Sequence, residues 1–113
     1  MKKVESIIRP ESFPALRERL DELEVNGLTV SEVAGYGKQK GLEGVFRGTR
    51  YEIKLYPKVK VEIVVEEEEV NKIVDLIKET CITGETGDGK IFIFPVENVI
   101  RIRTGEEGKE AII

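Results

Sequence analysis

The sequence predicts an α+β domain in which two helices cover one face of a four-stranded antiparallel sheet. The element order is β-α-β-loop-β-α-β, that of a split βαβ sandwich. Two observations lead to this prediction. Residues 58–66 alternate apolar and polar side chains, as a strand with one buried face does, whereas residues 70–81 carry apolar side chains at helical spacing. At 113 residues the whole chain, 1–113, forms a single domain with one core.

The first part of the chain predicts a strand, a helix and a second strand. Residues 2–8 form the first strand, which stops at Arg9-Pro10. The helix that follows has an apolar face made of Phe13, Leu16, Leu20 and Leu23. Asn26-Gly27 ends this helix, and residues 28–36 form the second strand.

Residues 35–55 show no helical period. Glycines and basic residues are interspersed there: Gly35, Gly37, Lys38, Lys40, Gly41, Gly44, Arg47, Gly48, Arg50 and Lys54. A loop of this length in so small a domain is usually functional or disordered. We favour a mobile interaction loop, and the alternative is an extended hairpin whose strands simply project.

The second part of the chain predicts a strand, a helix and a fourth strand. The third strand turns Val59, Val61, Ile63 and Val65 to one face. Glu66 to Glu69 are better explained as a helix N-terminus than as an acidic tail, because carboxylates there complement the helix dipole. The buried face of the helix is then Val70, Ile73, Val74, Ile77 and Cys81, which makes Cys81 a core residue. Residues 90–96 form the fourth strand.

Apolar side chains occupy both faces of the predicted strands. Val64 lies opposite Ile63, and Phe92 lies opposite Ile93. Two helices cover only one face of the sheet, so the other face would be exposed. A half-open apolar face in a small domain predicts oligomerisation.

Composition excludes several classes of protein. A net charge of −4 gives no general electrostatic case for nucleic acid. The apolar runs are too short for a membrane span or a signal peptide, so we expect a cytoplasmic protein without membrane insertion. One cysteine, Cys81, cannot form an internal disulfide, and without histidine a zinc or copper site and the usual general base are not expected.

The most informative stretch is residues 83–92, which carry Gly84, Gly87 and Gly89 beside Lys90. Backbone N–H groups of such a glycine loop can converge on an anion, and phosphate is the commonest one. The alternative is a plain turn between a helix and a strand. A Walker A loop is excluded, because Ile91 replaces the Ser or Thr that holds Mg²⁺ and the segment leads from a helix into a strand.

Two further segments combine with this loop. Residues 35–41 approach a dinucleotide fingerprint, but they have one residue too many before the third glycine and no helix after it. Arg101 and Arg103 would share one face of a strand and bind an anion together. The alternative is salt bridging to Glu97, Glu106 or Glu107. Three cationic elements favour a polyphosphate ligand.

With these segments taken together, the sequence resembles the PII nitrogen-regulatory signalling family along nearly its whole length. The stretch Thr83-Gly84-Glu85-Thr86-Gly87-Asp88-Gly89-Lys90-Ile91-Phe92-Ile93-Phe94-Pro95-Val96 is similar to the family's C-terminal signature. Other similar segments are Lys2-Lys3-Val4-Glu5, Ile7-Ile8-Arg9-Pro10, Gly37-Lys38-Gln39-Lys40-Gly41, Pro57-Lys58-Val59-Lys60 and Arg101-Ile102-Arg103-Thr104-Gly105.

The resemblance implies a ferredoxin-like homotrimer that binds ATP or ADP in each cleft between subunits. Its parts would be a projecting loop at about 37–55, a phosphate-binding loop at 83–90 and a C-terminal segment at 101–113. Arg101 and Arg103 would come from the neighbouring subunit. The implied nucleotide-binding residues are Ile7, Thr29, Gly37, Lys38, Glu62, Val64, Gly87, Asp88, Gly89, Lys90, Arg101 and Arg103.

The resemblance also implies a second effector and a protein target. Mg²⁺ would sit on the ATP phosphates with Gln39 as a ligand, and 2-oxoglutarate would chelate it. The implied 2-oxoglutarate residues are Gln39, Gly41, Lys58 and Gly87, with the distal carboxylate on Lys58. The nucleotide would set the conformation of the projecting loop, which would dock on an ammonium channel at the membrane or on an enzyme such as glutamine synthetase. Arg47 matches the position that contacts the channel.

Several positions depart from the family pattern. Lys38 replaces the commoner arginine, and Phe46 stands where tyrosine is typical. Tyr51 lies where some members are uridylylated, and Thr49 where others carry a phosphorylated serine. We expect an unmodified Tyr51. Because the projecting loop departs from the family pattern, one alternative stays open: a divergent PII-like nucleotide-binding regulator that acts on a different transporter or enzyme.

We expect a regulator rather than an enzyme. Two further alternatives are an enzyme of slow ATP hydrolysis and a ferredoxin-like structural or metal-tolerance trimer that binds no nucleotide.

Overall fold

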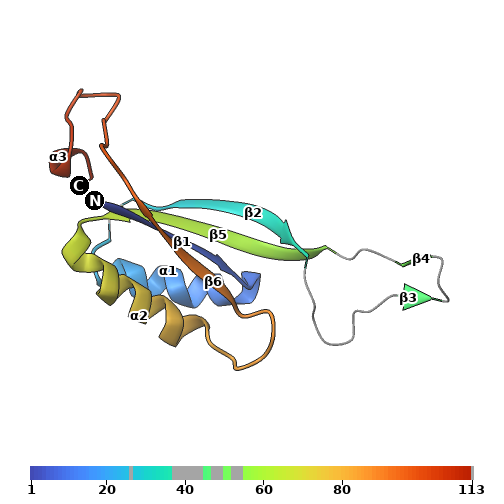
Figure 1. Cartoon of the computed structure of the whole chain (residues 1–113). Helices are drawn as coiled ribbons and strands as arrows, with labels where there is room; N and C mark the ends of the chain where they lie inside the picture. The colour runs from blue at the N-terminus through green and yellow to red at the C-terminus, as the bar shows by residue number, and fades with distance from the viewer. Residues whose placement is uncertain (26, 37–44, 47–49, 52–54, 113) are drawn as a thin grey trace.

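The structure is a computed structural model that describes residues 1–25, 27–36, 45–46, 50–51 and 55–112. Within that part of the chain the sheet strands and helices follow the predicted order (Figure 1). The elements are β1 (Lys2–Ile8), α1 (Phe13–Glu22), β2 (Thr29–Gly35), β3 (Val45–Phe46), β4 (Arg50–Tyr51), β5 (Tyr56–Val65), α2 (Val70–Cys81), β6 (Gly89–Pro95) and α3 (Lys109–Ile112).

The sheet has the strand order β2-β5-β1-β6, and every neighbouring pair is antiparallel. β1 therefore lies in the middle, between β5 and β6. Its last residue, Ile8, is paired with Val59 on one side and with Gly89 on the other. This register brings the start of β6 and the start of β5 to the end of β1, which is where the candidate site lies.

α1 and α2 lie side by side on one face of the sheet (Figure 1). The buried core between helices and sheet is Val4, Ile8, Leu16, Leu20, Val59, Val61, Ile63, Val65, Val70, Ile73, Leu76, Ile77 and Cys81. The predicted apolar face of β5 is thus confirmed, and so is the core position of Cys81, which is 6% exposed. Burial also raises the pKa of the Cys81 thiol.

The two helices begin and end differently from the prediction in detail. A turn of 3₁₀ helix at Glu67–Glu69 precedes α2, so the glutamates do lie at a helix N-terminus. α1 ends at Glu22, before Asn26-Gly27, because Glu24 adopts a positive φ of 59°. The Glu24 N–H then donates to Asp21 O at 2.9 Å and the Val25 N–H to Leu20 O at 3.2 Å, which closes the last turn.

Two short strands lie within the long segment before β5. β3 and β4 pair with each other as a separate antiparallel sheet, with Val45 opposite Tyr51 and Phe46 opposite Arg50. This pairing agrees with the alternative of an extended hairpin for the described residues of the segment, and the favoured role as an interaction loop stays a prediction. Among the described residues, no helix is long and apolar enough to cross a membrane.

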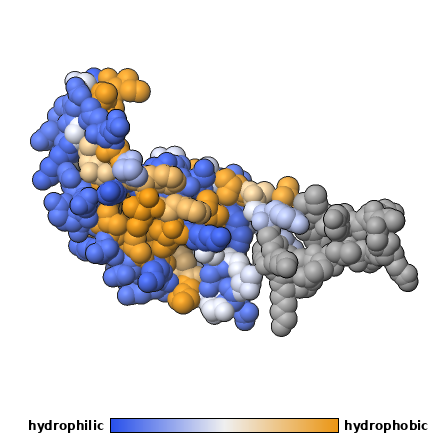
Figure 2. Space-filling view, in the orientation of Figure 1, coloured by the Kyte–Doolittle hydropathy of each residue, from blue (hydrophilic) through white to orange (hydrophobic). Residues whose placement is uncertain are grey.

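The edge strand β6 carries an apolar surface. Figure 2 shows apolar side chains gathered over β6 and the neighbouring α2. A groove of about 410 Å³ lies there, and Ile93 and Ile82, which are 50% and 69% exposed, are among the residues that line it. On the sheet face opposite the helices, Phe92 and Phe94 are 42% and 40% exposed. The prediction that apolar residues are exposed on the uncovered face of the sheet is confirmed.

Candidate functional site

The candidate site is the glycine loop between α2 and β6. Gly84, Gly87 and Gly89 all have positive φ, of 88°, 104° and 114°. A Cβ at Gly89 would lie only 1.8 Å from the backbone oxygen of Ile7, so β1 leaves room for glycine alone. The loop connects a helix to a following strand, which confirms that it is not a Walker A loop.

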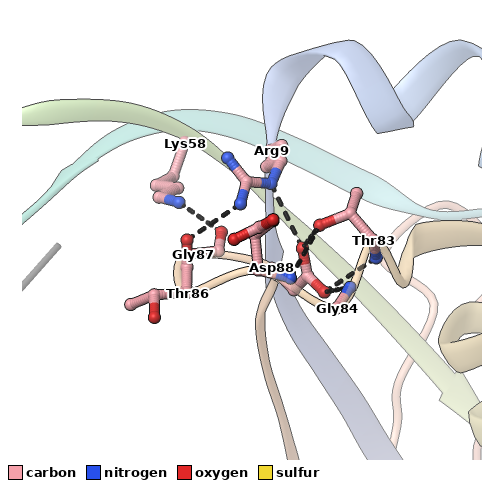
Figure 3. Close-up of polar contacts among 8 residues, drawn as sticks. Arg9, Lys58, Thr83, Gly84, Thr86, Gly87 and Asp88 are labelled. Atoms are coloured by element: carbon pink, nitrogen blue, oxygen red, sulfur yellow. Dashed lines mark hydrogen bonds and ion pairs between the residues drawn. The ribbon is translucent and has the colours of Figure 1, made fainter. Parts of the chain in front are cut away.

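Asp88 closes this loop from within (Figure 3). Its carboxylate accepts hydrogen bonds from the Thr83 N–H at 2.8 Å and the Gly84 N–H at 2.9 Å, and also from the Thr83 hydroxyl. Arg9 Nε adds an ion pair at 3.3 Å. These donors, the Thr83 hydroxyl first, hold the pKa of the Asp88 carboxyl well below its usual range. The Asp88 carboxylate therefore stabilises the conformation of the loop, because its negative charge is bound by donors of the loop and by Arg9.

Two cations hold the loop against the sheet (Figure 3). Arg9, just after β1, donates from Nη2 to Thr86 O at 2.9 Å, and Lys58 of β5 donates from Nζ to Gly87 O at 2.6 Å. Burial, and then the nearby charge of Arg9, lower the pKa of Lys58. Among the described residues, no group accepts a hydrogen bond from the N–H of Thr86 or Gly87. The loop is thus positioned from two strands while its tip keeps free donors.

The register places further predicted residues on the open face of the sheet. Paired residues share a face, and Ile7 pairs with Lys90 while Thr29 pairs with Glu62. Val64 and Lys58 follow on the same face, because they alternate with the buried Val59, Val61, Ile63 and Val65. The fold therefore brings together the predicted residues of β1, β2, β5 and β6.

Glu62 already has a partner on this face. Lys3 Nζ donates to its carboxylate at 2.9 Å, which lowers the pKa of Glu62 and raises that of Lys3. The same ammonium lies 4.9 Å from the ring centre of Phe94. A nucleotide that uses Glu62 would have to share it with Lys3.

The expectation that Arg101 and Arg103 share the face of a strand is wrong. Ile100 and Glu107 form an isolated antiparallel bridge, and the chain turns at residues 102–104 instead of continuing as a strand. The chain folds back because the Gly105 N–H, at a positive φ of 77°, donates to Arg101 O at 2.7 Å. Arg101 instead forms the ion pair with Glu106 that was the alternative.

Other predicted residues lie apart from the loop or outside the described residues. The segment that carries Arg101 and Arg103 lies at the opposite end of β6 from residues 83–88 (Figure 1). One chain therefore does not bring these arginines to the glycine loop. The structure gives no account of Gly37, Lys38, Gln39, Gly41, Arg47 and Thr49. Tyr51 lies in β4, and only its backbone is described.

Sequence reasoning did not assign Arg9 to the site, although it named Arg9 at the end of the first strand and in a segment similar to the family. The guanidinium reaches residues 77 and 79 positions away, at Thr86 and Asp88. The signal that identifies it is the pairing of Ile8 with Gly89, which is a property of the sheet register rather than of any local motif.

Comparisons with known proteins agree with this architecture. The family described as Nitrogen regulatory protein P-II matches residues 1–106. The chain is 51% identical over 112 residues to the Nitrogen regulatory protein P-II of Pasteurella multocida and to P-II 1 of Escherichia coli K12, covering 99% of this chain and 100% of each relative. A crystal structure of Arabidopsis thaliana PII bound to citrate is 42% identical, with a TM-score of 0.81 over 97% of this chain and 90% of that one. The chain belongs to the nitrogen regulatory protein P-II family.

Proposed function

We propose that this protein is a non-enzymatic regulator that senses ATP and ADP, and that binds 2-oxoglutarate together with Mg-ATP. The glycine loop at residues 83–90 carries this proposal. Its donors at Thr86 and Gly87 face no acceptor among the described residues, and Lys58 and Arg9 hold it in place. Lys90 follows on the open face of the sheet, so cations and N–H groups meet at one end of β1. Phosphate groups match this donor set.

A second copy of the chain would complete the site. The segment that carries Arg101 and Arg103 lies at the far end of β6 from the loop, so a nucleotide that contacts both elements would span two chains. Different surfaces of the two copies then meet, and such a heterologous contact forms a closed ring when the rotation between copies closes. We propose a homotrimer, with the exposed Phe92, Ile93 and Phe94 contributing apolar area to the contact.

The output would be the conformation of residues 37–55. Gly37 and Lys38 would contact phosphate at the root of this segment, and Gln39 would bind Mg²⁺. Lys58 holds Gly87 O, and the distal carboxylate of 2-oxoglutarate would compete for its ammonium, with Gly41 and Gly87 as further contacts. The proposed targets are an ammonium channel, contacted through Arg47, or a nitrogen-assimilation enzyme. Tyr51 and Thr49 are the positions to examine for covalent modification.

Calorimetry of the wild-type protein and of Arg103→Ala tests this proposal. We expect ATP to bind the wild type, and 2-oxoglutarate to bind only when Mg-ATP is present. Arg103→Ala should weaken ATP binding about 10- to 100-fold, the range for a charged hydrogen bond to phosphate. Arg17→Ala is the control, because Arg17 is 61% exposed and pairs only with Asp21 at 3.8 Å among the described residues.

Four outcomes would contradict this proposal. A wild-type protein that binds no ATP contradicts the proposal, and so does an Arg103→Ala protein that binds ATP as the Arg17→Ala control does. Steady-state ATP turnover that Lys90→Ala abolishes would favour an enzyme instead. Sedimentation equilibrium gives the mass of the assembly, and a monomer would contradict the shared site.

A further inference from the structure

The C-terminal segment at residues 98–110 is closed by its own hydrogen bonds. Asn98 Oδ1 accepts from the Val99 N–H at 2.9 Å and the Gly108 N–H at 3.2 Å, and Asn98 Nδ2 donates to Glu107 Oε1 at 2.7 Å. The Gly108 N–H also donates to Val99 O at 2.9 Å. A compact hairpin results, and Arg101 lies within it.

Both terminal amino groups of Arg101 are used inside this hairpin. Nη1 forms an ion pair with Glu106, and Nη2 donates to Glu110 O at 3.0 Å. The Arg101 N–H donates to Glu106 O at 2.9 Å, and the Thr104 hydroxyl donates to the Glu106 carboxylate at 2.9 Å. Glu106 is thus held on Arg101 by backbone and side chain together. A phosphate binds arginine through these same two amino groups.

The second predicted arginine differs. Arg103 is exposed, and it forms no ion pair with any other described residue. Among the described residues, Arg101 therefore forms an ion pair with a carboxylate and Arg103 does not. A phosphate that binds across Nη1 and Nη2 competes with the Glu106 carboxylate for Nη1 and with Glu110 O for Nη2. Binding in this bidentate geometry therefore displaces Glu106 from Nη1.

We propose that Glu106 is an internal competitor that occupies Arg101 until a nucleotide phosphate displaces it. This inference rests on the proposed nucleotide site. It assigns Glu106 a regulatory role: it weakens the affinity for nucleotides, and it makes the use of Arg101 depend on a ligand with enough negative charge to replace a carboxylate.

The test is calorimetric titration of ATP and ADP into the full chain carrying Glu106→Gln. Glutamine keeps an oxygen that accepts from Arg101 and Thr104 but removes the charge. We expect Glu106→Gln to bind ATP about two- to fivefold more tightly, the effect of losing a partly exposed ion pair. The matched control is Glu110→Gln, which removes the same charge from the same segment and keeps the carbonyl that accepts from Arg101. Its affinity should equal that of the wild type.

A double variant shows whether Glu106 acts through Arg101. In an Arg101→Ala background, Glu106→Gln should leave the ATP affinity unchanged. Equal affinities of Glu106→Gln and Glu110→Gln, or weaker binding by Glu106→Gln, would overturn the competition while leaving the nucleotide site intact. If the wild type and both glutamine variants bind no ATP, the proposed function itself fails, and this inference fails with it.

Discussion

The glycine loop at residues 83–88 and the C-terminal segment at residues 98–110 are both predicted to contact phosphate, but they are held in different ways. Arg9 and Lys58 attach the glycine loop to the ends of β1 and β5. The hydrogen bonds described above for residues 98–110 join that segment to itself. The glycine loop is thus bonded to the strands of the main sheet, whereas the hydrogen bonds described for the C-terminal segment lie within that segment.

This difference has a consequence for assembly. A loop held from two strands keeps its shape whether or not a ligand is present. A segment whose contacts are internal can change its position, or exchange an internal carboxylate for a phosphate, without disturbing the core. Such a division suits a site shared between copies of one chain.

The largest expected effect tests how tightly the glycine loop joins β1. Gly89→Ala should lower the free energy of unfolding by more than about 3 kcal/mol, because the new methyl group meets Ile7 O at 1.8 Å. Gly84→Ala is the matched control, since Gly84 also has a positive φ but nothing lies within 4 Å of its added Cβ. It should cost about 1 kcal/mol, from backbone strain alone. Urea denaturation measures both, and equal losses would show that β1 does not confine Gly89.

A second prediction concerns the charge within the loop. Asp88 has a depressed pKa in the folded protein, so its carboxylate stabilises the fold above the unfolded-state value of about 4, and this stabilisation is lost as the pH falls below that value. Asp88→Asn should therefore lower the thermal midpoint at neutral pH, and the difference from wild type should shrink towards about pH 3. Asp75→Asn, at an exposed position on α2, is the control for removing one carboxylate from the surface. If the difference in thermal midpoint between wild type and Asp88→Asn did not change with pH, the hydrogen bonds and ion pair of the Asp88 carboxylate would not stabilise the fold.

The smallest effect is expected in the C-terminal segment. Asn98→Ala removes the acceptor of the Val99 and Gly108 N–H groups, yet it should change the global free energy of unfolding by less than about 0.5 kcal/mol. Hydrogen exchange at Val99 and Gly108 should become faster, because the local hairpin opens. If Asn98→Ala lowered the global free energy of unfolding as much as Gly84→Ala does, this segment would unfold together with the core. The contrast between the two regions would then be wrong.

Local sequence patterns predict the order of the strands in the main sheet and of the two longer helices, and the buried faces of β5 and α2, all of which the structure confirms. They also single out the glycine loop, whose role as an anion site stays a prediction. These features depend on local periodicity and on residue types within a few positions of one another. The sequence also excluded a Walker A loop, because the order of helix, loop and strand can be predicted from the same patterns.

Which distant residues meet depends on the tertiary structure. The attachment of Arg9 and Lys58 to the loop follows from the register of β1 with β5 and β6, which no local pattern specifies. The turn after Arg101 depends on Gly105 and on the competition between pairing as a strand and closing a hairpin with Glu106. Local chemistry thus indicated the loop that is proposed to bind phosphate, and long-range pairing decided which cations hold that loop and which arginine already has a carboxylate partner.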